Sequence, residues 1–114
     1  MAKYECELRG DFDTILSELY EAATDSVTAD LEEESFFSGD GFRCAVQVYE
    51  RYSNIGGNRV SLNITLVEHD GRLHCSAISA GGSQAVFFKL NTFGEKAFLK
   101  TITDVLEKYE IKGQ

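Results

Sequence analysis

Proline is absent from the sequence, and no Gly/Ser-rich stretch or internal repeat interrupts its 114 residues. Nothing in the sequence therefore marks a boundary between two domains. A chain of this length suits one domain, because each half alone would be too short to enclose a hydrophobic core. We expect a single domain over residues 1–114.

Long apolar runs are also missing. No stretch approaches the roughly 18 apolar residues that a membrane span needs, and the opening MAKYECELRG lacks the apolar segment of a secretory signal. The unevenly spaced Cys6, Cys44 and Cys75 do not suit a disulfide framework. These features favour a soluble protein of the cytoplasm that has no membrane partner.

Basic residues are scarce in the first third of this acidic chain. Residues 1–40 hold 12 acids and 2 bases, whereas residues 41–114 hold 7 acids and 9 bases. Nucleic acid is an improbable partner, because polyanions bind to clustered Lys and Arg. The acidic segment 30–35 could be a docking strip for a basic partner or a divalent cation site. A solvated strand face is the more ordinary interpretation of such a run, and its role stays open.

Motifs of metal binding and catalysis are missing too. The sequence has no Cys-x-x-Cys or His-x-x-x-His pair, and all three cysteines fall on predicted core faces. We therefore expect no metal and no cofactor, and we lean towards a protein that is not an enzyme. The weakest of our hypotheses is an enzyme that uses Tyr49, Arg51 and His74 on one surface patch.

Alternating and helical patterns predict the order of the elements. Residues 3–9 alternate as a half-buried strand, and Asp11 is placed to cap a helix that ends near residues 24–26. An acidic edge strand should follow within residues 27–34. Thr92 and Glu95 form a capping box, which predicts that the last helix starts there and runs to about residue 110.

Two central segments, residues 42–52 and 59–69, carry the clearest strand patterns. In the first segment the even positions are apolar, which predicts that Phe42, Cys44, Val46 and Val48 face the core. Asp70-Gly71 predicts a two-residue hairpin that sets Leu66 opposite Cys75 and Ile64 opposite Ala77. With Val48 and Ile64 on one face, the preceding connection needs an odd number of residues, for example Ile55–Gly57.

The predicted fold is α+β. Its order is β-α-β-β-β-β-α, with a curved antiparallel sheet, two helices on one face and possibly one extra short strand within residues 84–90. This order resembles the TATA-binding-protein-like and helix-grip folds. Gly81 and Gly82 more plausibly form a turn than a phosphate cradle, because the next predicted helix starts too late to present its N-terminus to an anion.

The sheet face opposite the helices is the candidate interaction surface. Arg and Tyr are frequent anchors of interfaces, and mixed charges would suit a homodimer with an isologous interface. An ordinary wet sheet face is the competing interpretation. The candidate residues are Arg43, Gln47, Tyr49, Arg51, Arg59, Asn63 and His74.

A second hypothesis is a small-molecule binding protein. An apolar or anionic ligand would lie between the sheet and the C-terminal helix, in a pocket lined by Phe87, Phe88, Phe93 and Phe98. Buried aromatic residues are more often plain core, which is the competing interpretation of these four.

Two stretches, RCAVQVYERYSNIGGNRVSLNITLV and SAGGSQAVFFKLNTFGEKAFL, carry a resemblance that covers nearly the whole chain. The sequence resembles a family of small bacterial proteins of unknown function. The resemblance implies a bacterial, cytoplasmic, stand-alone domain. It implies no activity, substrate or catalytic residue, so a function has to be argued from the residues themselves.

Overall fold

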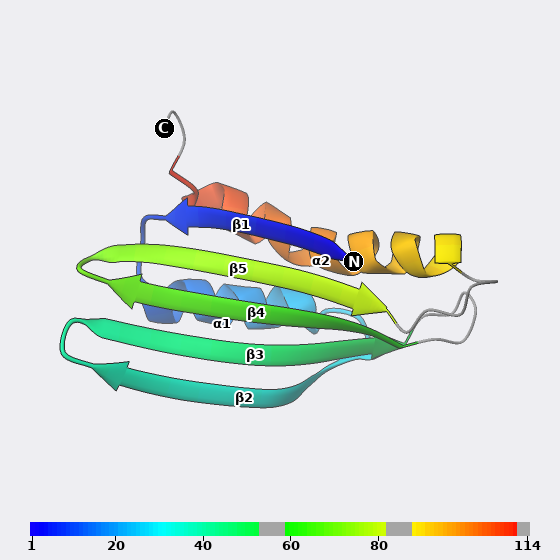
Figure 1. The fold of residues 1–114 in the computed structure, drawn as a ribbon, viewed down its shortest axis with the longest axis horizontal. Helices are drawn as coiled ribbons and strands as arrows, with labels where there is room; N and C mark the ends of the chain where they lie inside the picture. Colours follow the sequence, from blue (N-terminus) through cyan, green and yellow to red (C-terminus); the bar gives the residue numbers. More distant parts are fainter. Residues whose placement is uncertain (53–58, 82–87, 112–114) are drawn as a thin grey trace.

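A computed structural model describes residues 1–52, 59–81 and 88–111, and for residues 88–93 it describes the backbone alone. The predicted order β-α-β-β-β-β-α is confirmed (Figure 1). The elements are β1 (Ala2–Leu8), α1 (Phe12–Ala23), β2 (Ala29–Gly39), β3 (Phe42–Tyr52), β4 (Arg59–His69), β5 (Arg72–Gly81) and α2 (Phe88–Tyr109).

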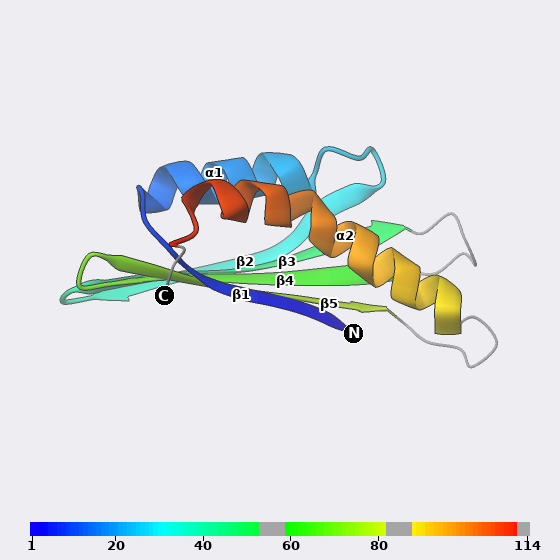
Figure 2. The same cartoon turned by 90° about the horizontal axis from the view of Figure 1, so that it is seen from above.

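The strands form one antiparallel sheet in the order β1-β5-β4-β3-β2. Both helices lie on the same face of this sheet, as the view from above shows (Figure 2). No described helix covers the opposite face. In the same part of the chain, no helix is long and apolar enough to cross a membrane.

Helix α1 starts where its capping residue predicts. Oδ2 of Asp11 accepts hydrogen bonds from the Thr14 backbone N–H at 2.9 Å and from the Thr14 hydroxyl at 2.8 Å. These bonds satisfy a donor that the first turn of a helix leaves without a partner. The apolar side of the helix then places Phe12, Ile15 and Leu19 in the core.

The β4–β5 hairpin forms as the sequence predicts. Asp70 and Gly71 both have positive φ angles, 52° and 78°, as expected for a tight two-residue turn between twisted strands. Leu66 lies opposite Cys75 and Ile64 opposite Ala77, so the predicted register is confirmed.

The predicted register of β3 against β4 is wrong. Tyr52 pairs with Arg59, so the connection 53–58 has an even number of residues, and Val48 lies opposite Asn63. Val48 and Ile64 therefore lie on opposite faces of the sheet. The loop suggested at Ile55–Gly57 lies outside the described residues.

The predicted start of the last helix is also wrong, because α2 begins at Phe88 and Thr92 lies inside it. Glu95 is buried and binds elsewhere. Its carboxylate accepts the Gly81 N–H at 2.7 Å and the N-terminal ammonium of Met1 at 2.6 Å. Residues 88–90 of the suggested extra strand are helical, and residues 84–87 are outside the described ranges.

The core lies between the sheet and the two helices. Its largest fully buried apolar members are Leu8, Ile15, Leu19, Tyr49, Leu62, Ile64, Leu66, Leu73, Phe98, Ile102 and Leu106. The helices are also joined by polar contacts, because the Lys108 ammonium lies 2.5 Å from Glu18 and the Tyr109 hydroxyl donates to the same carboxylate.

Candidate functional site: the open sheet face

The pairing of the strands assigns every side chain to one of two faces, because directly paired residues share a face and neighbours along a strand alternate. One row beneath the helices consists of Cys6, Cys75, Leu66, Ala45 and Phe36. The next row lies on the open face and consists of Glu5, Ser76, Thr65, Val46 and Ser35.

The alternation in β3 predicts that its even-numbered residues face the helices, but the structure turns its odd-numbered residues towards them. The Arg43 guanidinium lies 4.2 Å from the centre of the Phe12 ring of α1, and that of Arg51 lies 4.7 Å from the Phe98 ring of α2. Odd-numbered residues of β3 therefore face the helices. The prediction that Phe42, Cys44, Val46 and Val48 face the core is wrong, although Cys44 is buried.

The seven predicted interaction residues consequently divide between the two faces. Arg43, Gln47, Tyr49 and Arg51 lie beneath the helices, so their expected position on the open face is wrong. Arg59, Asn63 and His74 do lie on the open face. The error arises because β3 carries apolar residues on both faces, and alternation alone cannot tell which of the two the helices cover.

The buried polar residues of β3 satisfy each other. The Tyr49 hydroxyl donates to Oε1 of Gln47 at 2.6 Å, and Nε2 of Gln47 donates to Oε2 of Glu34 at 2.6 Å. Burial raises the pKa of the Tyr49 hydroxyl above its ordinary value. Because His74 lies on the other face, the structure does not bring together the three residues of the enzyme hypothesis.

An apolar stripe on the open face was missed by the sequence reasoning. Phe37 at one end of it is 54% exposed and meets Phe42 edge-on, with ring centroids 6.5 Å apart. The signal was present in the sequence, as the even positions of residues 42–48, but was assigned to the core. We define the apolar stripe as Phe37, Phe42, Cys44, Val46, Val48, Val67 and Ile78.

Charged residues of the open face pair with each other around this stripe. The Arg59 guanidinium lies 2.5 Å from Glu50, and that of Arg72 lies 3.5 Å from Glu7. Lys3 pairs with Glu5 at 3.7 Å, and Glu5 also accepts the Ser76 hydroxyl. The centre of the face therefore presents apolar and neutral side chains.

The alternative pocket is only partly described. Phe98 is fully buried in the core, Phe88 and Phe93 lie within α2, and Phe87 is outside the described residues. A hollow of about 560 Å³ opens instead where α1 and α2 come near the end of β3. It is lined by Glu18, Glu21, Ala22, Ala23, Asp25, Ser26, Arg51, Thr101 and Val105.

The three thiols are free but poorly suited to nucleophilic chemistry. Burial raises the pKa of Cys6 and Cys75 to about 12 and also raises that of Cys44. A nucleophilic cysteine needs the reverse shift. Within residues 1–52, 59–81 and 88–111, no three His, Cys, Asp or Glu side chains are grouped as a metal ion would require.

These features define a small α+β domain in which two helices cover one face of an antiparallel sheet and the other face is its candidate interaction surface. The chain belongs to a family of unknown function (DUF6054), whose model matches residues 1–110. No curated protein and no solved structure matches this chain.

Proposed function

We propose that the protein is a non-enzymatic interaction module that forms a homodimer through its open sheet face. The observation that carries this proposal is the apolar stripe along β3, which lies in the middle of a face whose Lys3, Arg59 and Arg72 each pair with an acid. Two such faces can stack as a sandwich, since sheets pack about 10 Å apart through interdigitated apolar side chains.

The charge pattern favours a second copy as the occupant of this face. Arg59, Arg72 and Lys3 each have an acidic partner on the same face, so a facing copy meets no uncompensated base, and acids such as Asp30 and Glu33 stand on the edge strand β2. A two-fold interface also needs one surface that complements itself, and a neutral apolar centre with a polar rim meets that need.

Solution mass tests the proposal. Light scattering after size exclusion should give a dimer for the unchanged protein, and Val46→Glu should give a monomer, because it places a charge in the centre of the stripe. Val27→Glu is the matched control. Val27 is 98% exposed beyond the end of α1, so this variant should remain a dimer.

Two outcomes would overturn the proposal. An unchanged protein that is monomeric at every concentration would remove self-association. A Val46→Glu protein that is still a dimer, with an unchanged circular dichroism spectrum, would place the interface elsewhere.

The second candidate is a small-molecule binding protein, and the observation that favours it is the hollow beside Arg51. The Arg51 guanidinium is partly buried and lies over the Phe98 ring, a setting in which a cation can hold an anionic group beside an apolar surface. A thermal-shift screen of organic anions tests it. A hit should disappear in Arg51→Met, and a hit that survives this change would place the ligand elsewhere.

The proposal includes a reducing, cytoplasmic setting. Cys6 and Cys75 lie directly opposite each other on β1 and β5, yet both are free. Free thiols in such proximity are typical of proteins kept in a reducing compartment.

A further inference from the structure

The two edges of the sheet differ in how their backbone groups are satisfied. At the end of β1, the Arg9 N–H donates to the Tyr109 carbonyl and the Ile111 N–H to the Glu7 carbonyl, each at 2.9 Å, so residues 109–111 cover this edge near Leu8. Strand β2 is the other edge. Within the described residues, no strand pairs with its outer side along Ala29–Gly39.

The outward backbone groups of β2 can be assigned from the pairing. The Tyr52 N–H donates to the Thr28 carbonyl, so even-numbered residues of β3 direct their backbone groups towards β2. Their partners after the bulge near Leu31 are Glu33, Ser35 and Phe37. Glu34, Phe36 and Ser38 lie between and after these partners and direct N–H and C=O away from the sheet. The Glu34 N–H donates to Oε1 of Glu33 at 3.2 Å, a solvent-exposed bond that an added strand would have to replace.

The second half of this edge lacks most of the devices that prevent pairing with another chain. Natural edges are protected by proline, by charged side chains, lysine above all, by β-bulges or by very short strands. Strand β2 is 11 residues long and contains neither proline nor lysine. Its one irregularity lies between Leu31 and Glu33, which leaves Glu33–Gly39 as an unbroken run.

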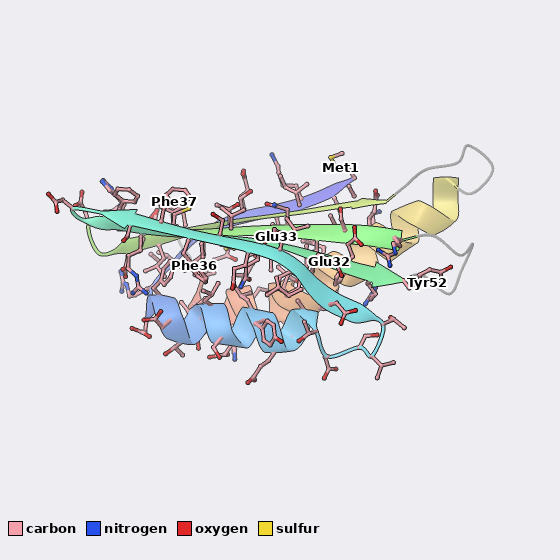
Figure 3. All side chains as sticks on the ribbon, turned by 90° about the horizontal axis from the view of Figure 1, so that it is seen from below. Met1, Glu32, Glu33, Phe36, Phe37 and Tyr52 are labelled. Atoms are coloured by element: carbon pink, nitrogen blue, oxygen red, sulfur yellow. The ribbon has the colours of Figure 1, made fainter. Side chains whose placement is uncertain are left out.

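Exposed aromatic side chains flank the edge on both faces of the sheet. Phe36 is 58% exposed on the helix side, and Phe37 lies on the opposite side (Figure 3). Tyr20 of α1 is 45% exposed and lines a groove of about 290 Å³ between α1 and β2, together with Leu16 and Glu34. Both alternating side-chain sets of an added strand would therefore find an apolar contact.

Charge distinguishes between the possible occupants of this edge. Strand β2 carries four acids and no base, whereas Asp13 and Glu18 of α1 already pair with Arg43 and Lys108. A second copy would add four more acids to this edge, whereas a basic segment would compensate those of β2. Glu32 and Glu33 stand directly on the strand, as Figure 3 shows.

We propose that β2 is a strand-addition site that binds an extended, basic segment of another protein. The segment adds to the sheet through the outward backbone groups of Glu34, Phe36 and Ser38. Its apolar residues contact Phe36 and Tyr20, and its Lys or Arg residues lie near the acidic first half of β2. The site lies at the edge of the sheet and shares Phe37 with the apolar stripe, and the outward backbone groups of β2 stay available in a dimer formed by the open face.

The first experiment titrates the full-length, isotope-labelled protein with a peptide of alternating Lys and Val that is long enough to span Glu33–Gly39. The amide signals of Glu34, Phe36 and Ser38 should shift and saturate. A peptide of the same composition with its Lys and Val in separate blocks should bind at least about tenfold more weakly, because it cannot present alternating faces. Equal binding of the two peptides would show that net charge alone accounts for the binding, and this would overturn the proposal.

Two peptide isomers test the backbone pairing without changing the protein. One carries N-methyl groups on one alternate set of amides, and the other carries them on the remaining set. Only one set faces β2 in a paired strand, so one isomer should lose binding and the other should retain it. Retention of binding by both isomers would exclude strand addition.

Variants of the protein complete the test. Ser38→Pro removes an outward N–H and should weaken binding by about tenfold, whereas Ser38→Ala should bind as the unchanged protein does. Val46→Glu, which acts on the open face and adds no positive charge, should not weaken peptide binding. If the protein is a dimer that is lost in Ser38→Pro and retained in Val46→Glu, a second copy occupies the edge. This outcome would overturn the proposal of a basic partner.

Discussion

The Tyr49 hydroxyl and Oε1 of Gln47 are joined by a hydrogen bond of 2.6 Å, and both side chains are buried beneath the helices. The two residues lie on one strand, two positions apart, and so share a face. Because Gln47 also donates to Glu34, the hydroxyl of Tyr49 and both ends of the Gln47 amide each have a partner. This pair explains how β3 can turn polar residues towards the core.

Single substitutions in this pair should be costly and the double substitution less so. Gln47→Leu leaves the buried Tyr49 hydroxyl without an acceptor, and Tyr49→Phe leaves the Gln47 carbonyl oxygen without that donor. Each should lower the free energy of unfolding by about 1–3 kcal/mol. The double variant should lose less than the sum, as measured by urea denaturation at neutral pH. Additive losses would show that the two side chains act independently.

Stability should fall at alkaline pH because of Cys6 and Cys75. Burial raises the pKa of both thiols from 9.0 to about 12, so the folded protein holds these protons more tightly than the unfolded chain does. Their contribution is complete below about pH 9 and is lost as the pH rises towards 12, by at most about 1.4 kcal/mol per pH unit for each thiol.

Urea denaturation from neutral pH to about pH 11 measures this loss. The variant with Cys6→Ala and Cys75→Ala should show a flatter profile between pH 9 and 10. Above that range Tyr4 and Tyr49, whose pKa values are raised as well, act in the same direction in every variant. Superimposable profiles of the two proteins would contradict the assignment to the thiols.

The elements that the sequence predicted correctly depend on local chemistry. Asp70-Gly71 needs only its own backbone preferences to form a two-residue turn, and this turn fixed the register of β4 against β5. The face of β3 depends instead on where the helices pack. Val46 and Val48 follow the apolar alternation that is typical of core residues, but the helices cover Ala45 and Tyr49.

The prediction of the candidate site also depended on which face of each strand the helices cover. Arg59, Asn63 and His74 were placed on the open face correctly because the hairpin fixed β4 and β5. The apolar stripe was missed because its β3 residues, Phe42, Cys44, Val46 and Val48, were predicted to face the core. The wrong prediction for Glu95 has the same cause. Its capping-box spacing is a local signal, but its carboxylate makes a tertiary contact with the Gly81 N–H, which local spacing does not predict.

The N-terminal cap of α1 should respond to the chemistry of its side chain. Asp11→Ala removes the acceptor for the Thr14 N–H and should lower the melting temperature, whereas Asp11→Asn keeps an acceptor and should change it little. Hydrogen bonds from Thr14 hold the pKa of Asp11 below its ordinary value. The stabilisation from the ionised cap is therefore present above the unfolded pKa, near 3.8, and is lost as the pH falls.

Thermal unfolding monitored by circular dichroism at neutral and acidic pH tests both statements. The difference between the unchanged protein and Asp11→Ala should shrink as the pH falls below about 4, because the unfolded chain binds the proton first, and it should be smallest once the cap is protonated in both states. A difference that is constant across this pH range would show that Asp11 acts through packing and not through its charge.

Glu95 should hold the end of β5 against α2. Its buried carboxylate accepts the Gly81 N–H at 2.7 Å, so Glu95→Ala leaves that donor without its partner and should lower the free energy of unfolding by about 1–3 kcal/mol. Glu95→Gln keeps an acceptor and should lose less. Hydrogen exchange at the Gly81 amide gives a local measurement, and exchange should be faster in Glu95→Ala than in Lys96→Ala, a control at the exposed neighbour. Equal exchange at Gly81 in both variants would show that the contact does not protect the end of β5.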